Sequence, residues 1–217
     1  MKEKQDLGSL RKSYEKGGLS DREKTQNPMN LFARWFTEAE ATPAIEEANA
    51  MSLVTQGLDG YPKARVVLLK HYDTEGFVFY TNYESGKAAA LQVFSQASML
   101  FPWNELDRQV TVTGSVSPVS DEESDAYFAS RPRDSQLGAW ASAQSRMIDS
   151  RAALLEQLAE VTARFGEGKI PRPSHWGGYR LVPIAWEFWQ GGESRLHDRY
   201  RYTRTDDNSW LITRLQP

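Results

Sequence analysis

Three side chains that could bind a phosphate recur at four-residue spacing, at Tyr127, Arg131 and Ser135. Residues 120–123 read Ser-Asp-Glu-Glu, a pattern typical of a helix N-terminus, and a proline directly after Arg131 ends the predicted helix. Tyr127 and Arg131 would then share a helix face, with Ser135 in the next turn. A phenol, a guanidinium and a hydroxyl supply the directed donors that phosphate requires. The alternative is a surface cluster in which Arg131 pairs with the acids of residues 121–125.

A second group of cations follows a Gly-Gly pair, at Arg195, His197 and Arg199. If this run is extended, alternate side chains lie on one face, and these three point the same way. Aligned cations repel one another unless an anion compensates them. Either an anionic ligand or an acidic neighbouring strand would do so, and the spacing does not decide between them.

A third group surrounds the apolar run Arg65-Val-Val-Leu-Leu-Lys70, which has a cation at each end. It could be a core strand with solvated ends, or a strand beside a flat ring whose ends hold phosphate. Lys87 lies in the first turn of a predicted helix, where backbone N–H groups also favour anions. Uncharged donors and acceptors that could contact a heterocycle, or could be ordinary surface residues, are Gln109, Gln144 and Ser145.

Hydrophobic periodicity and turn residues predict the elements that position these groups. The predicted helices are one starting at Pro28 after an Asn27 cap, a short one after Pro43, and Gly86–Phe94, Ser120–Pro132 and Arg151–Phe165. The predicted strands are Met51–Leu58 and Ala64–Tyr72, joined by an Asp-Gly turn, and Gly76–Asn82, Ser98–Trp103, Arg108–Val119, Tyr179–Gln190, Arg199–Thr203 and Trp210–Leu215. The predicted helices are too few to alternate with the strands. The pattern therefore favours a mainly β antiparallel barrel with peripheral helices.

The polar residues 1–27 are predicted to form a flexible arm, and residues 28–217 a single domain. In the arm, Arg11 and Tyr14 could share one side of a helical turn, or belong to a solvated tail.

Composition excludes several classes of protein. The 217 residues contain no cysteine, which removes disulfides, thiolate zinc sites and iron–sulfur clusters and fits a reducing cytoplasm. Three histidines far apart in sequence argue against a metal site, and we expect none. A net charge of −3 argues against a nucleic-acid coat, and no apolar run is long enough to span a membrane.

Long strings of residues resemble one family, the pyridoxamine 5′-phosphate oxidases. The similarity extends from about Leu10 to the C-terminus in order and spacing. The strings are Arg65-Val-Val-Leu-Leu-Lys-His-Tyr-Asp73, Phe79-Tyr-Thr-Asn82, Leu100-Phe-Pro-Trp103, Arg108-Gln-Val110, Ser130-Arg-Pro-Arg-Asp-Ser-Gln136, Gly138-Ala-Trp140, Trp176-Gly-Gly178, Glu187-Phe-Trp-Gln-Gly-Gly-Glu193 and Arg195-Leu-His-Asp-Arg199.

The resemblance implies a homodimeric split β-barrel that binds FMN across the subunit interface, with dimerisation and substrate-binding residues in the C-terminal region. It implies oxidation of pyridoxamine 5′-phosphate or pyridoxine 5′-phosphate to pyridoxal 5′-phosphate, with O₂ reduced to hydrogen peroxide. The alternatives are a flavin or vitamin B6 carrier without turnover and a split-barrel flavin reductase. No nucleic acid or membrane partner is expected.

The same resemblance implies roles for individual residues. Residues expected to bind FMN are Arg65, Val66, Val67, Leu68, Leu69, Lys70, Tyr80, Thr81, Lys87, Gln109, Gln144, Ser145, Trp189 and Arg199. The substrate phosphate would contact Lys70, Tyr127, Arg131 and Ser135. Arg195 and His197 would lie over the substrate ring as the catalytic pair, and Arg11 and Tyr14 would close over the site.

One position departs from the family pattern. The family usually has Ser-Arg-Lys where this chain has Ser85-Gly86-Lys87, so an expected phosphate contact is missing. The loss of one charge-assisted hydrogen bond costs about 1.5–3 kcal/mol. We therefore expect weaker retention of FMN, or compensation by another cation such as Arg146.

Overall fold

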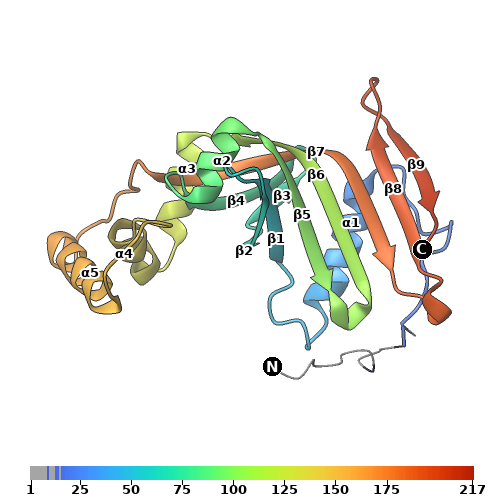
Figure 1. The fold of residues 1–217 in the computed structure, drawn as a ribbon, viewed down its shortest axis with the longest axis horizontal. Helices are drawn as coiled ribbons and strands as arrows, with labels where there is room; N and C mark the ends of the chain where they lie inside the picture. Colours follow the sequence, from blue (N-terminus) through green and yellow to red (C-terminus); the bar gives the residue numbers. More distant parts are fainter. Residues whose placement is uncertain (1–8, 10–12, 15) are drawn as a thin grey trace, which may run out of the picture. The chain divides into compact units, whose positions relative to one another are not determined.

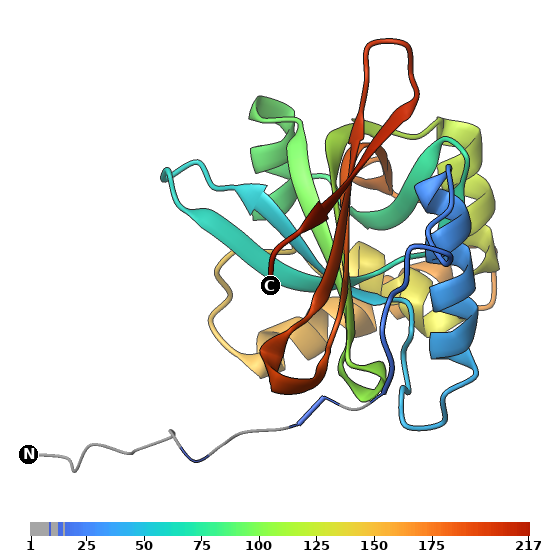
Figure 2. The same ribbon diagram turned by 90° about the vertical axis from the view of Figure 1, so that its right-hand side faces the viewer.

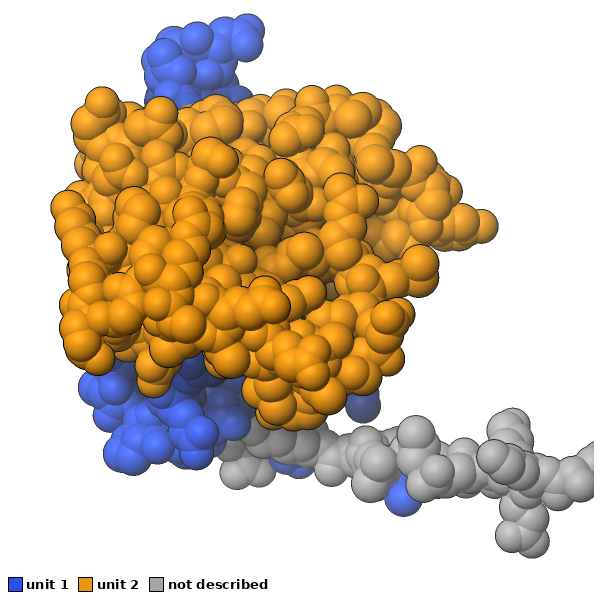
Figure 3. Space-filling model, turned by 90° about the vertical axis from the view of Figure 1, so that its left-hand side faces the viewer, with its two compact units in different colours: residues 1–48, 102–111, 186–217 blue, residues 49–101, 112–185 orange. Residues whose placement is uncertain are grey.

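The computed structural model describes Ser9, residues 13–14 and residues 16–217. The chain forms two compact units, each assembled from segments distant in sequence (Figure 3). Unit 1 comprises residues 1–48, 102–111 and 186–217, and unit 2 comprises residues 49–101 and 112–185. Within unit 1, Leu19 of the predicted arm is buried, and its backbone N–H donates to the Asp198 carboxylate at 2.8 Å.

Nine strands form one antiparallel sheet in the order β2-β1-β5-β6-β7-β4-β3, with β8 paired to β7 and to β9. The strands are β1 (Ala50–Gln56), β2 (Pro62–Leu68), β3 (His71–Asp73), β4 (Gly76–Asn82), β5 (Gln96–Trp103), β6 (Arg108–Pro118), β7 (Trp176–Gln190), β8 (Asp198–Arg204) and β9 (Trp210–Leu215). The helices are α1 (Pro28–Glu40), α2 (Gly86–Val93), α3 (Asp121–Ser130), α4 (Arg133–Ala141) and α5 (Arg151–Phe165) (Figure 1). The predicted mainly β fold with peripheral helices is confirmed.

In unit 1, helix α1 begins as predicted, because the Asn27 side chain accepts a hydrogen bond from the Met29 N–H at 2.9 Å. Its apolar face is buried, with Phe32 against Trp103 and Trp35 against Phe188. Figure 2 shows β8 and β9 as a hairpin that leads to the C-terminus.

In unit 2, the Asp-Gly turn joins β1 to β2 as predicted, with Thr55 opposite Lys63 and Leu53 opposite Arg65. The prediction of one strand over Ala64–Tyr72 is wrong. The Leu69 N–H donates to the carbonyl of Asn49, the residue before β1, whereas the Lys70 N–H donates to the Val78 carbonyl of β4, both at 2.9 Å. The chain therefore changes its pairing partner between these two residues, and β2 ends there.

The capping prediction for α3 is confirmed, because the Ser120 hydroxyl accepts from the Glu123 N–H at 3.1 Å. Helix α5 ends at Phe165, as predicted, and Gly166 follows it with φ +49°. The short helix expected after Pro43 does not form. Residues 41–47 form turns and are mostly exposed, so a helix there would bury no apolar face.

Candidate active site

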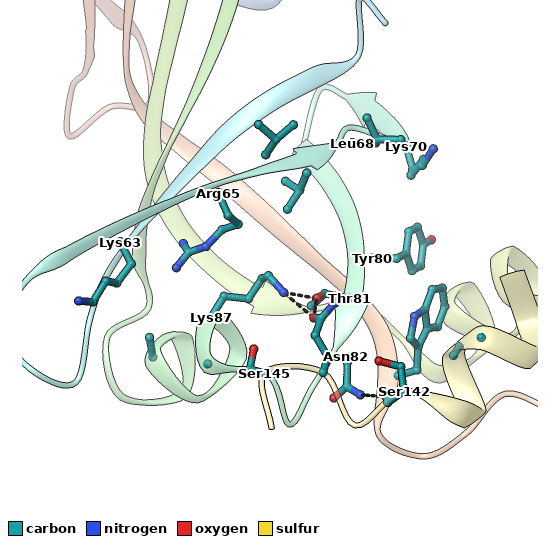
Figure 4. Close-up of a pocket in the computed structure, with 18 of the residues that line it drawn as sticks. Lys63, Arg65, Leu68, Lys70, Tyr80, Thr81, Asn82, Lys87, Ser142 and Ser145 are labelled. Atoms are coloured by element: carbon teal, nitrogen blue, oxygen red, sulfur yellow. Dashed lines mark hydrogen bonds between the residues drawn. The ribbon is translucent and has the colours of Figure 1, made fainter. Parts of the chain in front are cut away.

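A cavity of about 1100 Å³ in unit 2 collects most of the predicted site residues. Strands β2 and β4, helix α2 and the α3–α4 region contribute its walls (Figure 4). Of the predicted residues in this unit, those that line it are Arg65, Val66, Val67, Leu68, Lys70, Tyr80, Thr81, Lys87, Tyr127, Arg131, Ser135, Gln144 and Ser145. The side chain of Leu69 is instead buried in the core.

Lys87 and Arg65 form a cationic region of this cavity. The Lys87 ammonium donates to Thr81 Oγ1 at 2.9 Å and to Gln144 Oε1 at 2.6 Å, and Arg65 donates to Thr55 Oγ1 at 2.9 Å. Burial, with a further contribution from the Arg65 charge, lowers the pKa of Lys87 to about 8. Burial also lowers the pKa of Arg65.

No carboxylate compensates these two cations. Among the described residues, the hydrogen bonds of Lys87 and Arg65 go to hydroxyl, amide and backbone oxygens. Half-buried cations with neutral partners gain stability when an anion binds beside them. The region is therefore suited to a phosphate.

An aromatic stack forms another wall. The Tyr80 and Tyr127 rings lie 3.9 Å apart between centroids, and the Tyr80 and Trp176 rings lie 5.4 Å apart, all nearly parallel. Burial, with the nearby Glu123 carboxylate, raises the pKa of Tyr80 to about 12, so its hydroxyl stays protonated at physiological pH. Gly178 allows this packing, because a Cβ there would lie 2.7 Å from the Tyr80 ring.

Arg131 follows the last residue of α3 and carries a buried, unused donor. Its guanidinium carbon lies 4.6 Å from the Trp176 ring centroid, and its Nη1 is buried with no hydrogen-bond partner among the described residues. Burial lowers the Arg131 pKa. A buried guanidinium N–H without an acceptor is costly, and a bound phosphate would satisfy it.

The alternative of an Arg131 ion pair with the acids of α3 is wrong. Those acids bind Arg172 instead, which contacts Asp121 at 2.6 Å and Asp125 at 2.5 Å. Arg133 donates to the carbonyls of the loop that follows α5. Arg131 thus remains available for a ligand.

The core-strand interpretation of the Arg65–Lys70 run is also wrong. Strand β2 lies at an edge of the sheet and is mostly exposed. Val66 is 69% exposed and Lys70 is exposed, and both line the cavity. An exposed apolar strand beside a cationic region fits a planar ligand that carries a phosphate.

The remaining predicted residues belong to unit 1. Tyr14, Trp189 and His197 form an aromatic cluster there. The Trp189 and His197 ring centroids lie 4.7 Å apart, and the Tyr14 ring centroid lies within 5.6 Å of both. Gln109 lies with Tyr14 and Trp189 on a smaller cavity of about 170 Å³. Arg11 lies outside the described residues.

The extended run predicted for Arg195 to Arg199 is wrong in its first half. Glu193–Arg195 form a 3₁₀ turn, and Arg195 is exposed with φ +65°. The strand begins only at Asp198, because this turn bends the chain first. Arg199 pairs with Glu187 through two nitrogens at 2.7 and 2.9 Å, so the acidic-strand alternative is correct for this residue.

Among the cavity residues that sequence reasoning did not assign are Trp176 and Lys63. Trp176 lies in one of the strings that carry the resemblance, but the resemblance implied no role for it. Lys63 was also missed, although it lies two residues before Arg65 and so shares its strand face. Helix α4, which carries Ser135, was not predicted because Gly138 weakens its helical signal.

Replacing Gly86 by arginine is expected to tighten FMN binding about tenfold by adding a charge-assisted contact to the cavity. A Cβ at Gly86 is accommodated without strain, because it meets only the Ser145 hydroxyl, at 3.9 Å. Titration of flavin-free protein with FMN measures the effect. An unchanged affinity would show that this position does not contribute to phosphate binding.

Comparisons with known proteins agree with this geometry. The family model described as pyridoxamine 5′-phosphate oxidase matches residues 37–165, and that of the pyridoxine 5′-phosphate oxidase C-terminal dimerisation region matches residues 176–217. The pyridoxine/pyridoxamine 5′-phosphate oxidases of Cupriavidus pinatubonensis and Burkholderia lata are each 53% identical, over 97% of this chain and 99% of the relative.

Solved structures confirm the expected split-barrel fold. PhzG from Burkholderia lata, in complex with tetrahydrophenazine-1-carboxylic acid, has a TM-score of 0.85 at 33% identity and covers 92% of this chain and 98% of its own. A pyridoxamine 5′-phosphate oxidase-related, FMN-binding protein from Nostoc punctiforme has a TM-score of 0.71 at 16% identity, over 89% of this chain and 100% of its own. With two family models and half-identical relatives matching nearly its full length, this chain belongs to the pyridoxine/pyridoxamine 5′-phosphate oxidase family.

Proposed function

We propose that this chain oxidises pyridoxine 5′-phosphate or pyridoxamine 5′-phosphate to pyridoxal 5′-phosphate, using FMN, as a homodimer in the cytoplasm. Family membership supports the activity, and the matched dimerisation region supports the homodimer. The observation that carries the proposal for this chain is that one cavity holds two groups of phosphate donors, Lys87 with Arg65 and Arg131 with Tyr127. A reaction that brings a phosphorylated flavin to a phosphorylated substrate needs two such groups.

FMN fits the first region. Its phosphate would lie against Lys87 and Arg65, with Gln144 and Ser145 as uncharged partners, and its ring along the exposed residues 66–68. Tyr80, Thr81 and Lys70 complete this wall. Lys87 already donates to neutral oxygens and carries a lowered pKa, so a dianion would replace weak partners with a strong one.

The substrate phosphate fits the second region. Arg131 would donate its unused Nη1, and the hydroxyls of Tyr127 and Ser135, with the Lys70 ammonium, would add further donors. The Trp176 ring beneath Arg131 limits the movement of the guanidinium and so fixes the direction of its donors.

When bound, FMN would supply the two-electron oxidation chemistry, with O₂ reduced to hydrogen peroxide and, for the amine substrate, water consumed and ammonia released. The chain contributes binding and orientation. Holding both phosphates at fixed points sets the distance between the reacting atoms, and such alignment can supply much of a rate enhancement.

For the residues of unit 1 we keep the expected roles as proposals. Arg195 and His197 contact the substrate ring, Tyr14 and Arg11 close over it, and FMN is contacted by Gln109, Trp189 and Arg199. The Tyr14–Trp189–His197 cluster supports a role in ring binding. Arg199 would have to exchange its Glu187 partner or contact FMN while keeping it.

Replacing Arg195 by leucine is expected to lower kcat/KM about 100-fold, because the proposed contact of the guanidinium with the substrate ring would be lost. Arg195 is exposed, with a backbone φ of +65°, and its side chain has no ion pair among the described residues. Folding stability should stay unchanged for the same reason. Steady-state kinetics with thermal unfolding measures both quantities. Full kcat/KM in the variant would refute the assignment of Arg195.

The function is tested by mixing FMN-loaded protein with pyridoxine 5′-phosphate under nitrogen and recording the visible flavin absorption. We expect bleaching with this substrate or with the amine, and recovery of colour with hydrogen peroxide when air is admitted. Flavin that never bleaches with either compound would favour a carrier, and bleaching with NAD(P)H alone would favour a flavin reductase.

A further inference from the structure

Lys63 is a cation of the cavity that none of the expected contacts uses. It lies two residues before Arg65 on β2, so the two side chains extend from the same side of the strand (Figure 4). Thr55 lies directly opposite Lys63 on β1, and Arg65 reaches diagonally to the Thr55 hydroxyl at 2.9 Å. This contact brings the guanidinium towards Lys63.

The cationic side of the cavity therefore includes Lys63, Arg65 and Lys87. Of these, Lys63 alone has an acidic partner among the described residues, Asp59, at 2.6 Å. The hydrogen bond from Lys63 is the main cause that lowers the pKa of Asp59. Both side chains are about half exposed, at 48% for Lys63 and 54% for Asp59. An ion pair this exposed contributes little and is readily exchanged for a better anion.

The tip of the β1–β2 hairpin leaves room for this lysine. A Cβ at Gly57 would lie 3.0 Å from the Lys63 Cε and 2.6 Å from Asp59 Oδ1. Gly57, Leu58 and Asp59 also line the cavity, so the hairpin tip is part of its wall. The Lys63 ammonium lies 5.7 Å from the centroid of the exposed Tyr61 ring, a weak contact that does not fix its position.

We propose that Lys63 is a third cationic ligand of the FMN phosphate, held by Asp59 until the phosphate binds. This inference rests on the proposed function, because it places FMN in this cavity. Lys63 then supplies the charge that Gly86 does not. Arg146, the compensating cation expected from the sequence, is exposed and is absent from the described lining of the cavity, whereas Lys63 belongs to it.

The test compares FMN with riboflavin, which has the same ring but no phosphate. Flavin-free protein is titrated with each ligand, following flavin fluorescence, for the wild type, Lys63→Gln, Asp59→Asn and the double variant. The matched control is Lys24→Gln, since Lys24 also pairs with an aspartate, Asp21 at 3.5 Å, but belongs to unit 1.

We expect Lys63→Gln to weaken FMN binding about three- to tenfold and to leave riboflavin binding unchanged, since the lost contact is to phosphate. Asp59→Asn should tighten FMN binding by removing the competing acid. In the double variant this gain should vanish, because no lysine remains to be released. Lys24→Gln should change the affinity for neither FMN nor riboflavin.

Two results would overturn the inference. One is an FMN affinity that is unchanged in Lys63→Gln, and the other is an equal loss for FMN and riboflavin, which would indicate a structural effect. Failure of the proposed function looks different, since either the wild type itself would bind no FMN or its bound flavin would not bleach with either substrate.

Discussion

Replacing Arg131 by alanine is expected to raise the KM for pyridoxine 5′-phosphate about 10- to 100-fold and to change kcat by less than about threefold. A hydrogen bond to a charged group contributes about 1.5–3 kcal/mol, which corresponds to this range. The phosphate is bound equally in the ground state and the transition state, because no bond to it changes during oxidation. Its loss therefore appears in KM rather than in kcat.

Arg133→Ala is the matched control for this variant. Arg133 is two residues away but donates to the carbonyls of Gly166 and Gly168, so its removal should lower the unfolding temperature without raising KM. Arg131→Ala should instead raise KM without lowering the unfolding temperature, since Arg131 Nη1 has no hydrogen-bond partner to lose among the described residues. A pure kcat defect in Arg131→Ala would contradict its assignment to the substrate phosphate.

Replacing Lys87 by methionine is expected to weaken FMN binding about 100-fold, the effect of losing a charge-assisted contact in a partly buried site. Methionine keeps most of the apolar stem, so the helix α2 packing should be retained. Riboflavin, which lacks the phosphate, should bind the variant and the wild type with similar affinity.

The lowered pKa of Lys87 adds a pH dependence to FMN binding. In the flavin-free protein Lys87 is protonated below its pKa of about 8 and becomes neutral above it. The bound phosphate favours the charged form, so binding above pH 8 must be accompanied by proton uptake. FMN affinity in the wild type should therefore fall as the pH rises through 8.

Titrations of both proteins with FMN at a series of pH values measure this dependence. The fall in affinity should be absent from Lys87→Met, because the titrating group has been removed. An identical pH profile in the two proteins would show that another group controls binding.

Local spacing along the sequence predicted the elements that carry several of the cavity-lining residues. The cap at Ser120 fixed the start of α3, and with it the positions of Tyr127 and Arg131 relative to one another. The Asp-Gly turn fixed the β1–β2 register and thus the face that carries Arg65. Features of this kind depend on neighbours within a few residues.

Other features depend on tertiary contacts that spacing does not reveal. The change of pairing partner at Leu69 requires two different strands beside one segment. The Glu187 partner of Arg199 lies twelve residues away on β7, and Arg172, which binds the acids of α3, lies beyond α5. The strand spacing places Lys63 on the same face as Arg65, but only the tertiary structure shows that the face at Lys63 lines a cavity.

The most direct test of the account is a crystal structure of this chain with FMN and pyridoxal 5′-phosphate bound together. We expect the FMN phosphate within hydrogen-bond distance of Lys87 and Arg65, and the vitamin phosphate within hydrogen-bond distance of Arg131 Nη1 and the Tyr127 hydroxyl. A structure in which both ligands are bound while Lys87 and Arg131 face solvent would contradict the account.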